Sequence, residues 1–233
     1  MLVDYHIHTS WSHGEMTVSE VVNKAKELNL NAIAITDHAN KNSEWIPSYV
    51  AELNDLKKRL KGEIDLIIGI EVKMLDFNGR VDFNVRWLSS LDVILIAIHR
   101  IPGVSTSDLS ELSEDLPHMY AELIISAIEK VNFSIPVIIA HPGKWLIENG
   151  LPFIPREYWG YIADAARSFG KIVEYNTSAP PPKEFVDVLL SNKVKMSVGS
   201  DAHSLSEVGF GVAEAANFIG DLLVKPKELL RIG

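Results

Sequence analysis

The chain has 233 residues, of which 47% are hydrophobic and 23% charged, the composition of an ordinary globular protein. It contains eight histidines and no cysteine, which excludes disulfides, cysteine-based zinc sites, iron–sulfur clusters and thiol nucleophiles. A formal net charge of −9 opposes non-specific attraction to a phosphate backbone, so we expect no long nucleic acid as a partner. Any bound metal must use histidine and carboxylate ligands, and a small anionic substrate would need locally supplied positive charge.

Apolar stretches in the chain are short. Residues 93–98 form one of the longest, far below the roughly 20 residues that a transmembrane helix needs. The first residues reach Asp4 without a basic region or a long apolar core, so a secretory signal is not expected. We therefore expect a cytoplasmic protein with no membrane partner, and the sequence leaves the oligomeric state open.

Short runs rich in β-branched residues alternate with stretches of helical periodicity. The predicted strands are residues 2–8, 32–37, 65–71, 92–99, 136–141, 171–176 and 195–200. The predicted helices are residues 17–28, 44–60, 117–131, 155–169 and 182–190. The first helix begins with Thr17 and Glu20, which together form a capping box. Pro117, Pro155 and Pro182 suit the first turns of three others.

This alternation predicts parallel strands joined by crossover helices, in an open doubly wound sheet or a closed barrel. Nearly continuous apolar strands, such as 93–98, fit a sheet that is covered on both faces. No flexible linker divides the chain, so we expect a single domain over residues 1–233.

Most of the histidines follow or end predicted strands. In chain order these strand-end groups are His6, His8, His38, Glu71, His99, His141, Asp201 and His203. The carboxyl ends of parallel strands form one face of an α/β fold, where ligands gather, so we expect these side chains to converge. His118 lies at a predicted helix start and is expected to be an ordinary helix residue.

The spacing of these residues favours metal binding. His6 and His8 lie two apart on a strand and point to the same side, while Asp201 and His203 have the same spacing just past a strand. His13, in the loop after the first strand, can reach the end of the fold at which these side chains converge. A set dominated by imidazole favours zinc, manganese or iron over calcium or magnesium. Seven imidazoles and two carboxylates exceed the needs of one ion, so two or three divalent ions are predicted.

Several short motifs occur in a fixed order between residue 4 and about residue 211. They are Asp4-Tyr5-His6-Ile7-His8-Thr9, Ser12-His13-Gly14, Thr36-Asp37-His38, Gly69-Ile70-Glu71, Ile98-His99, Ala140-His141-Pro142 and Gly199-Ser200-Asp201-Ala202-His203. Together they resemble the PHP family, named for polymerase and histidinol phosphatase. The resemblance implies a distorted seven-stranded (β/α)7 barrel, forming a single PHP-type domain, with a trinuclear metal centre at the carboxyl ends of the strands.

The resemblance also implies which side chains hold each ion. One ion would take His6, His8, Glu71 and Asp201, and Glu71 would bridge to a second ion held by His99 and His141. The third ion would take His13, His38 and His203. Asp4 and Asp37 would orient their neighbours rather than bind metal directly. Residues 174–178, Glu-Tyr-Asn-Thr-Ser, are similar to a strand of the PHP histidinol phosphatases.

The function predicted from these features is that of a metal-dependent phosphoric ester hydrolase. We expect a phosphomonoesterase that acts on a small phosphorylated metabolite, such as a histidinol-phosphate-like compound, through a metal-activated hydroxide. Glu71, Asp201 and His203 are the predicted catalytic residues. Arg100 and Lys144 are candidate phosphate contacts, because each is a basic residue close to a strand end.

Three alternatives remain open. A nuclease or nucleotide phosphodiesterase on short substrates could use the same cluster, although no basic stripe with interleaved aromatic residues favours long nucleic acid. A non-catalytic barrel subunit would have no reason to keep nine ligands. Amidohydrolases share the His-x-His motif but usually carry a metal-bridging lysine at a strand end, which the predicted strand ends do not offer.

Overall fold

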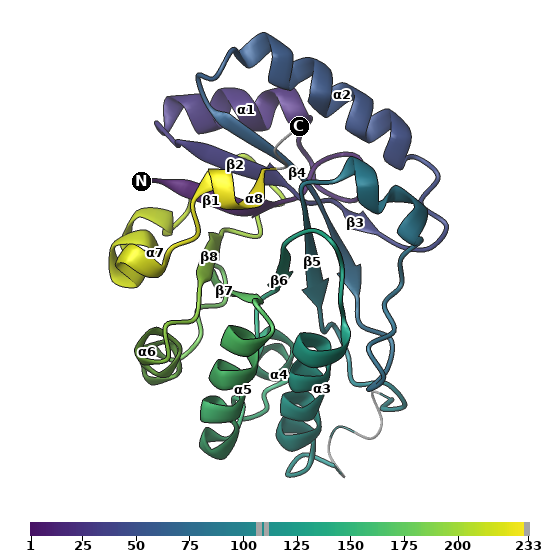
Figure 1. Ribbon diagram of the computed structural model, residues 1–233, viewed down its shortest axis with the longest axis vertical. Helices are drawn as coiled ribbons and strands as arrows, with labels where there is room; N and C mark the ends of the chain where they lie inside the picture. Colours follow the sequence, from purple (N-terminus) through teal and green to yellow (C-terminus); the bar gives the residue numbers. More distant parts are fainter. Residues whose placement is uncertain (106–108, 110–111, 231–233) are drawn as a thin grey trace.

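The computed structural model describes residues 1–105, 109 and 112–230. The strands are β1 (Val3–Ile7), β2 (Ala32–Ile35), β3 (His38–Ala39), β4 (Asp65–Lys73), β5 (Val93–Ala97), β6 (Val137–Ile139), β7 (Ile172–Asn176) and β8 (Met196–Gly199). Seven of them are parallel neighbours in the order β1-β2-β4-β5-β6-β7-β8, and the short β3 pairs with β4 (Figure 1). Every predicted strand is present. The short β3, just after β2, was not predicted.

The sheet closes on itself through residues that lie beyond the end of β8. Ile7 in β1 forms a parallel bridge with Ala202. The Asp201 amide donates a hydrogen bond to the His6 carbonyl (2.8 Å), and the His8 amide donates one to the Ala202 carbonyl (2.9 Å). We call this join between β1 and the segment after β8 the seam. The distorted seven-stranded barrel predicted from the sequence is therefore confirmed.

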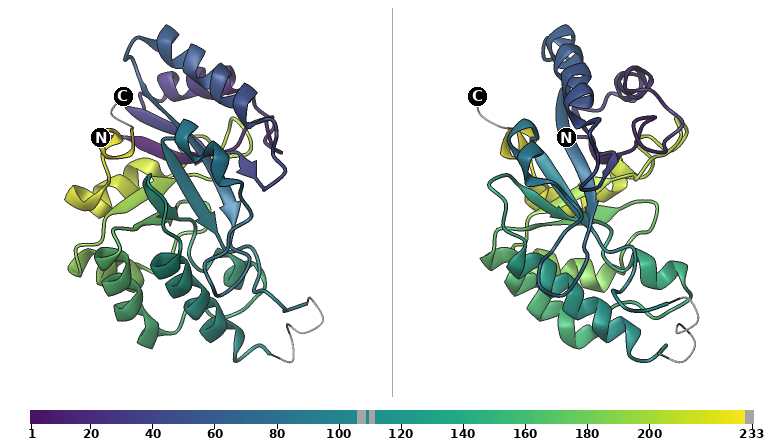
Figure 2. Two further views of the ribbon diagram at one scale, coloured as in Figure 1. Left: turned by 45° about the vertical axis from the view of Figure 1, so that its right-hand side comes forward. Right: turned by 90° about the vertical axis from the view of Figure 1, so that its right-hand side faces the viewer.

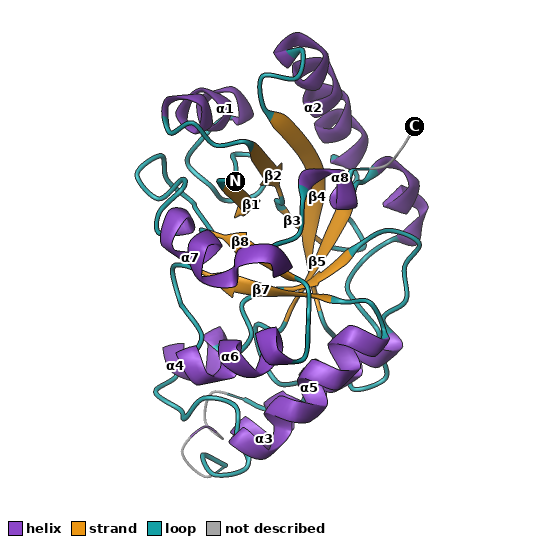
Figure 3. Ribbon diagram, turned by 60° about the vertical axis from the view of Figure 1, so that its left-hand side comes forward, coloured by secondary structure: helices purple, strands orange, loops and turns teal. Residues whose placement is uncertain are grey.

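Helices cover the outside of the strands (Figures 1 and 3). The α-helices are α1 (Val18–Glu27), α2 (Ile46–Leu60), α3 (Leu116–Lys130), α4 (Lys144–Glu148), α5 (Arg156–Ser168), α6 (Lys183–Ser191), α7 (Val212–Ile219) and α8 (Pro226–Leu229). The structure also contains two 3₁₀ helices, η1 (Val85–Ser90) and η3 (Gly220–Leu222). The five predicted helices are present, and the capping box of Thr17 and Glu20 forms at the start of α1. The helices α4, α7 and α8 were not predicted.

The connection from β4 to β5 departs from the expected strand–helix alternation. It contains an antiparallel bridge between Met74 and Val81, followed by η1, and the sequence predicted no helix for these residues. The bridge forms because Asp76 accepts hydrogen bonds from the amides of Asn78 (2.9 Å) and Arg80 (3.2 Å). Gly79, with φ of +86°, supplies the left-handed residue that this turn needs.

The strands are buried on both faces, as the apolar runs predicted. Figure 2 shows the strands between the helices in two further views. Tyr49 of α2 ties two strands together, because its buried hydroxyl lies 2.7 Å from the carbonyl oxygens of both Ile35 in β2 and Gly69 in β4. Within the described part of the chain, no helix combines the length and apolarity needed to cross a bilayer.

Candidate metal centre

Glu71, near the end of β4, lies at the centre of a cluster of imidazoles. Its side chain is only 1% exposed. Five rings place a nitrogen within 3.6 Å of one of its oxygens: His6, His8, His38, His99 and His141. The shortest of these contacts are His38 Nδ1 to Oε2 (2.7 Å) and His141 Nε2 to Oε1 (2.8 Å). Although burial opposes ionisation, His6, His141 and His38 hold the pKa of Glu71 well below its usual range.

The two histidines of the first strand region meet Asp201 across the seam. The Nε2 atoms of His6 and His8 lie 3.0 Å apart, because residues two apart on an extended chain face the same side. Asp201 Oδ1 lies 3.6 Å from His6 Nε2 and 3.3 Å from His8 Nε2. Asp201 has a φ of +59°, a left-handed conformation that is uncommon for residues other than glycine. The backbone bond at the seam holds it there.

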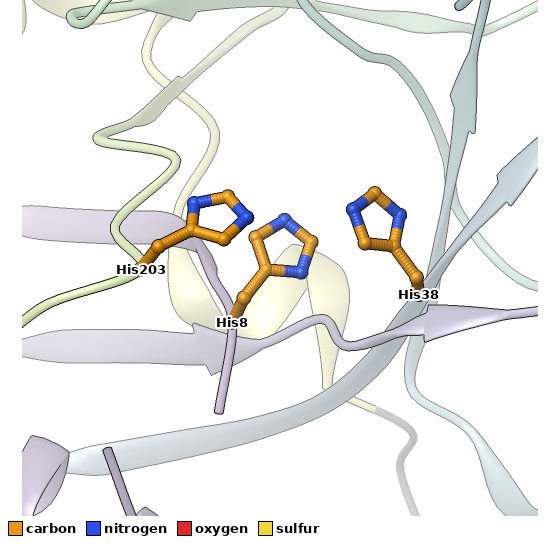
Figure 4. Close-up of side chains that lie close together, drawn as sticks. All are labelled: His8, His38 and His203. Atoms are coloured by element: carbon orange, nitrogen blue, oxygen red, sulfur yellow. The ribbon is translucent and has the colours of Figure 1, made fainter. Parts of the chain in front are cut away.

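A third group lies on the more open side of the cluster. Figure 4 shows the ring of His8 between those of His38 and His203. The ring centroid of His8 lies 4.3 Å from that of His38 and 4.4 Å from that of His203. His13, from the loop after β1, places its ring 4.4 Å from His38 and 4.8 Å from His203.

Three sets of side chains bring their ligand atoms within 4.8 Å of one another. They are His6–His8–Asp201, His6–Glu71–His141 and His8–His38–His203. These sets contain seven of the nine residues expected to hold metal, and the other two, His13 and His99, lie against His38 and Glu71 at the same carboxyl ends of the strands. His118 lies apart on α3, 3.8 Å from Glu157. The assignment of ligands to separate ions stays a prediction.

The chemistry of these donors fits divalent transition metals. Buried polar atoms normally have hydrogen-bond partners, yet His8 Nδ1, His141 Nδ1 and Glu71 Oε2 make no well-formed hydrogen bond among the described residues, although His38 Nδ1 lies 2.7 Å from the Glu71 oxygen. A cation on the carboxylate would satisfy the Glu71 oxygen. Burial lowers the pKa of His8 to about 3, so its ring is kept in the neutral form that metals bind. Imidazole and carboxylate donors together suit zinc, manganese or iron.

Glu174 in β7 orients two of the histidines, and the sequence reasoning did not include it among the site residues. Its Oε1 lies 2.8 Å from His6 Nδ1, and its Oε2 accepts a hydrogen bond from the His141 amide (2.5 Å). Asn176 donates to the same carboxylate at 3.3 Å. The available signal was the two-residue spacing of Glu174 and Asn176 on a buried strand, which places both on the inner side.

Glu174 and His6 leave no room for a side chain at Gly199, at the end of β8. A Cβ atom built there would collide with Glu174 Oε1 and His6 Cβ. The glycine therefore lets β8 approach close enough for the contact between Glu174 and His6 to form.

Asp4 and Asp37 hold the loops that carry the ligands, as expected. Asp4 accepts hydrogen bonds from the amide and hydroxyl of Ser200 (2.8 and 2.6 Å) and from the Gly209 amide (2.9 Å). Asp37 accepts bonds from the amides and hydroxyls of Thr9 and Ser12. Burial raises the pKa of each carboxylate, and the hydrogen bonds that each accepts oppose this rise.

The cluster forms the floor of a cavity of about 510 Å³. Lys144 at the start of α4 lies on its wall, with Nζ 2.5 Å from Asp201 Oδ2. Although burial opposes the charge, Asp201 raises the pKa of Lys144. Lys73, Trp145 and Glu148 also line the cavity and were not singled out in the sequence. Arg100, the other candidate phosphate contact, lines a separate cavity beside Met74 and Ile101.

Comparisons with known proteins identify a matching family and similar sequences. The model of the PHP domain family matches residues 4–178. A protein of Caldanaerobacter subterraneus named a probable phosphatase is 28% identical over 245 residues, with 99% of this chain and 86% of that protein covered. A probable phosphatase of a Thermoanaerobacter species is 29% identical over 223 residues, with 90% and 82% covered.

Among solved structures, the histidinol phosphate phosphatase of Lactococcus lactis has a similar fold. That structure is a complex with zinc, L-histidinol and phosphate. It superposes with a TM-score of 0.70 at 20% sequence identity, over 95% of this chain and 93% of that one. The match of the family model over most of the chain, together with the cluster of ligands in a seven-stranded barrel, establishes that this chain belongs to the PHP domain family.

Proposed function

We propose that the chain is a metal-dependent phosphoesterase that hydrolyses a small phosphomonoester, similar in kind to histidinol phosphate. The observation that carries the proposal is the buried Glu71 carboxylate. Five imidazoles surround it at the floor of a cavity of about 510 Å³. A cavity of this size fits a small metabolite. Relatives along nearly the whole chain are named probable phosphatases.

The chain's own residues hold and orient the ions. The proposed ligands of two to three zinc, manganese or iron ions are His6, His8, His13, His38, Glu71, His99, His141, Asp201 and His203. When bound, such ions supply an activated water and a positive charge that stabilises the phosphoryl oxygens. Glu71 and Asp201 set the position of the ions with their buried carboxylates, and Glu174 keeps His6 in the correct tautomer by accepting from its Nδ1.

Lys144 is the proposed contact of this chain with the substrate phosphate. Its ammonium group already lies on the cavity wall against Asp201, where it can donate to an anionic oxygen. Lys73 adds a second positive charge to the wall. Arg100 faces a different cavity, so we rank it below these two lysines as a phosphate contact.

A panel of phosphorylated metabolites, assayed with zinc, manganese and iron supplied in turn, tests the proposal. We expect the Glu71→Gln variant to fold but to lose at least about 100-fold in turnover, because losing a ligand charge in a metal site weakens the site strongly. The His118→Ala variant removes a histidine outside the cluster and should keep full activity. Near-normal turnover of Glu71→Gln would overturn the metal-centre assignment.

The same assay separates the other candidate activities. Faster cleavage of short oligonucleotides than of monoesters, with a steep salt dependence, would identify a phosphodiesterase. Cleavage of C–N bonds without action on phosphate esters would identify an amidohydrolase. Purified protein without bound metal, and without a gain in thermal stability when zinc or manganese is added, would favour a non-catalytic barrel.

A further inference from the structure

A separate cavity, with several charged residues in its lining, lies at the opposite end of the barrel from the metal centre. It occupies about 260 Å³ between the amino-terminal ends of β6, β7 and β8, the carboxyl end of α5, and α8. Its charged lining residues are Arg167, Lys171, Lys193, Lys195 and Glu228. We call it the basal cavity. It shares no lining residue with the cavity of the metal centre.

Lys171, at the entry to β7, is the unusual residue of the basal cavity. It is only 7% exposed, and lysine is rarely buried to this extent without a partner. No hydrogen bond or ion pair joins its ammonium group to any residue that the structure describes. Burial lowers its pKa. The charge of Lys171 therefore has no compensating partner among the described residues, although most of the residue is buried.

The nearby helix ends do not account for the lysines. Positive side chains often serve the free carbonyls at helix carboxyl ends. Backbone amides already bond these carbonyls: at the end of α5, the amides of Phe169, Gly170 and Lys171 donate to residues 165–167. At the end of α6, the amides of Asn192, Lys193 and Val194 donate to residues 188–190 in the same way. The lysine ammonium groups remain available.

The remaining charges of the basal cavity leave two lysines uncompensated. Lys195 lies 3.3 Å from Glu228, which neutralises it. Arg167 lies 3.6 Å from the exposed carboxylate of Asp164. Lys193, like Lys171, has no ion pair within the described ranges. In a chain of net charge −9, two unpaired lysines that line one concave site form a local centre of positive charge.

We propose that the basal cavity is a second ligand site, which binds a small phosphate-bearing anion. Lys171 would contact the anion from the floor and Lys193 from the rim, as two charge-assisted donors. The volume of about 260 Å³ limits the ligand to free phosphate or a small phosphate ester, because typical pockets for larger molecules begin at about 300 Å³. The site is independent of the metal centre and of the reaction proposed there.

Equilibrium dialysis of labelled inorganic phosphate against the metal-loaded protein tests the proposal. We expect Lys171→Met, which nearly preserves the side-chain volume, to bind one phosphate fewer per chain than the wild type. Its metal content and its rate of hydrolysis at low phosphate should be unchanged. The Lys193→Ala variant alters an exposed residue that cannot threaten folding, and it should weaken the same binding step at least tenfold.

Lys58→Ala is the matched control, because it removes one positive charge from α2, which contributes no residue to the basal cavity. It should bind phosphate like the wild type. A binding isotherm that Lys171→Met and Lys193→Ala leave unchanged would overturn the proposal, even if the metal centre hydrolyses phosphate esters as expected. Repeating the dialysis with ethylphosphonate as competitor tells the two sources apart, since tighter binding of the phosphonate identifies an ester as the ligand and weaker binding identifies free phosphate.

Discussion

Glu71 remains ionised in the protein interior because imidazoles compensate it on every side. Sequence reasoning located this carboxylate and its histidines because parallel strands bring their carboxyl ends to one face. It missed Glu174, since that side chain acts through His6 and His141 rather than as a ligand. A residue that acts through its neighbours has no spacing rule of its own, so its role emerges only when the strands are placed side by side.

Replacing Glu174 by glutamine tests this orienting role. The amide keeps the size of the side chain but loses the charge that fixes the tautomer of His6. We expect metal affinity or turnover to fall by about 10–100-fold, as is usual when such a partner is lost, with little change in fold. Glu157→Gln, at an exposed site beside His118, is the control. Equal metal affinity in the two variants would argue against the role of Glu174.

Metal binding should depend on pH through His6. Burial disfavours its charge, but Glu174, Asp201 and Glu71 raise its pKa well above the usual value. In the metal-free protein, His6 therefore carries a second ring proton at neutral pH, and a metal ion must displace this proton to bind. The free-energy cost of displacing this proton is present below the raised pKa of His6 and disappears as the pH rises through it. Metal affinity should therefore increase by about tenfold per pH unit for each displaced proton. Zinc competition with a coloured chelator between about pH 6 and 8 measures this, and a flat profile would contradict it.

At the level of elements, the sequence predicted correctly the helices whose starts are marked by nearby residues. The capping box at Thr17 and the prolines at helix starts marked helices correctly. The helix α4 was not predicted, because its five residues are too few for a periodic pattern. The β4–β5 connection was left without a predicted element, because its turn depends on Asp76 and Gly79 rather than on a periodic pattern.

The capping box at the start of α1 should contribute measurably to stability. Thr17→Ala removes the hydroxyl that accepts from the Glu20 amide, and such caps contribute about 1 kcal/mol. For a chain of this size, the midpoint of thermal unfolding should fall by about 2–4 °C. Ser19→Ala, a neighbouring exposed substitution in the same helix, should change it far less.

Tyr49 should stabilise the fold by more than the burial of its ring alone, because its hydroxyl joins α2 to two strands. Tyr49→Phe leaves the carbonyls of Ile35 and Gly69 without this donor in a buried place. The free energy of unfolding should fall by about 1–2 kcal/mol in urea titrations. Tyr161→Phe, on the exposed face of α5, should have no measurable effect, and equal losses in both variants would remove the special role of Tyr49.

At the level of the whole molecule, the sequence predicted the barrel and the face on which the polar residues meet. It could not predict how the barrel closes, because the seam is made by bonds of Asp201 and Ala202 to β1. Those bonds depend on a left-handed residue and on the close approach that Gly199 permits. The basal cavity was also hidden, since its lysines are dispersed along the chain.

Removing metal should destabilise the whole fold, because the proposed ligands lie on both sides of the seam. At metal concentrations about 100-fold above the dissociation constant, binding adds about 2.7 kcal/mol. Chelation should therefore lower the midpoint of thermal unfolding by about 5–11 °C, and added zinc or manganese should restore it. Scanning calorimetry measures the change. The Glu71→Gln variant should respond far less, and an identical response would place the stabilising ions elsewhere.

The seam also sets the order in which a newly made chain can become functional. His6 and His8 are synthesised before their partner Asp201, which follows almost 200 residues later in the chain. Contacts between such distant segments form late, because closing a long loop costs entropy before any contact repays it. A partly synthesised chain can form its early strands and helices, but the group of His6, His8 and Asp201 cannot assemble before Asp201 has been made. Closure of the barrel, and metal binding by this group, must therefore follow the synthesis of β8 and of Asp201 beyond it.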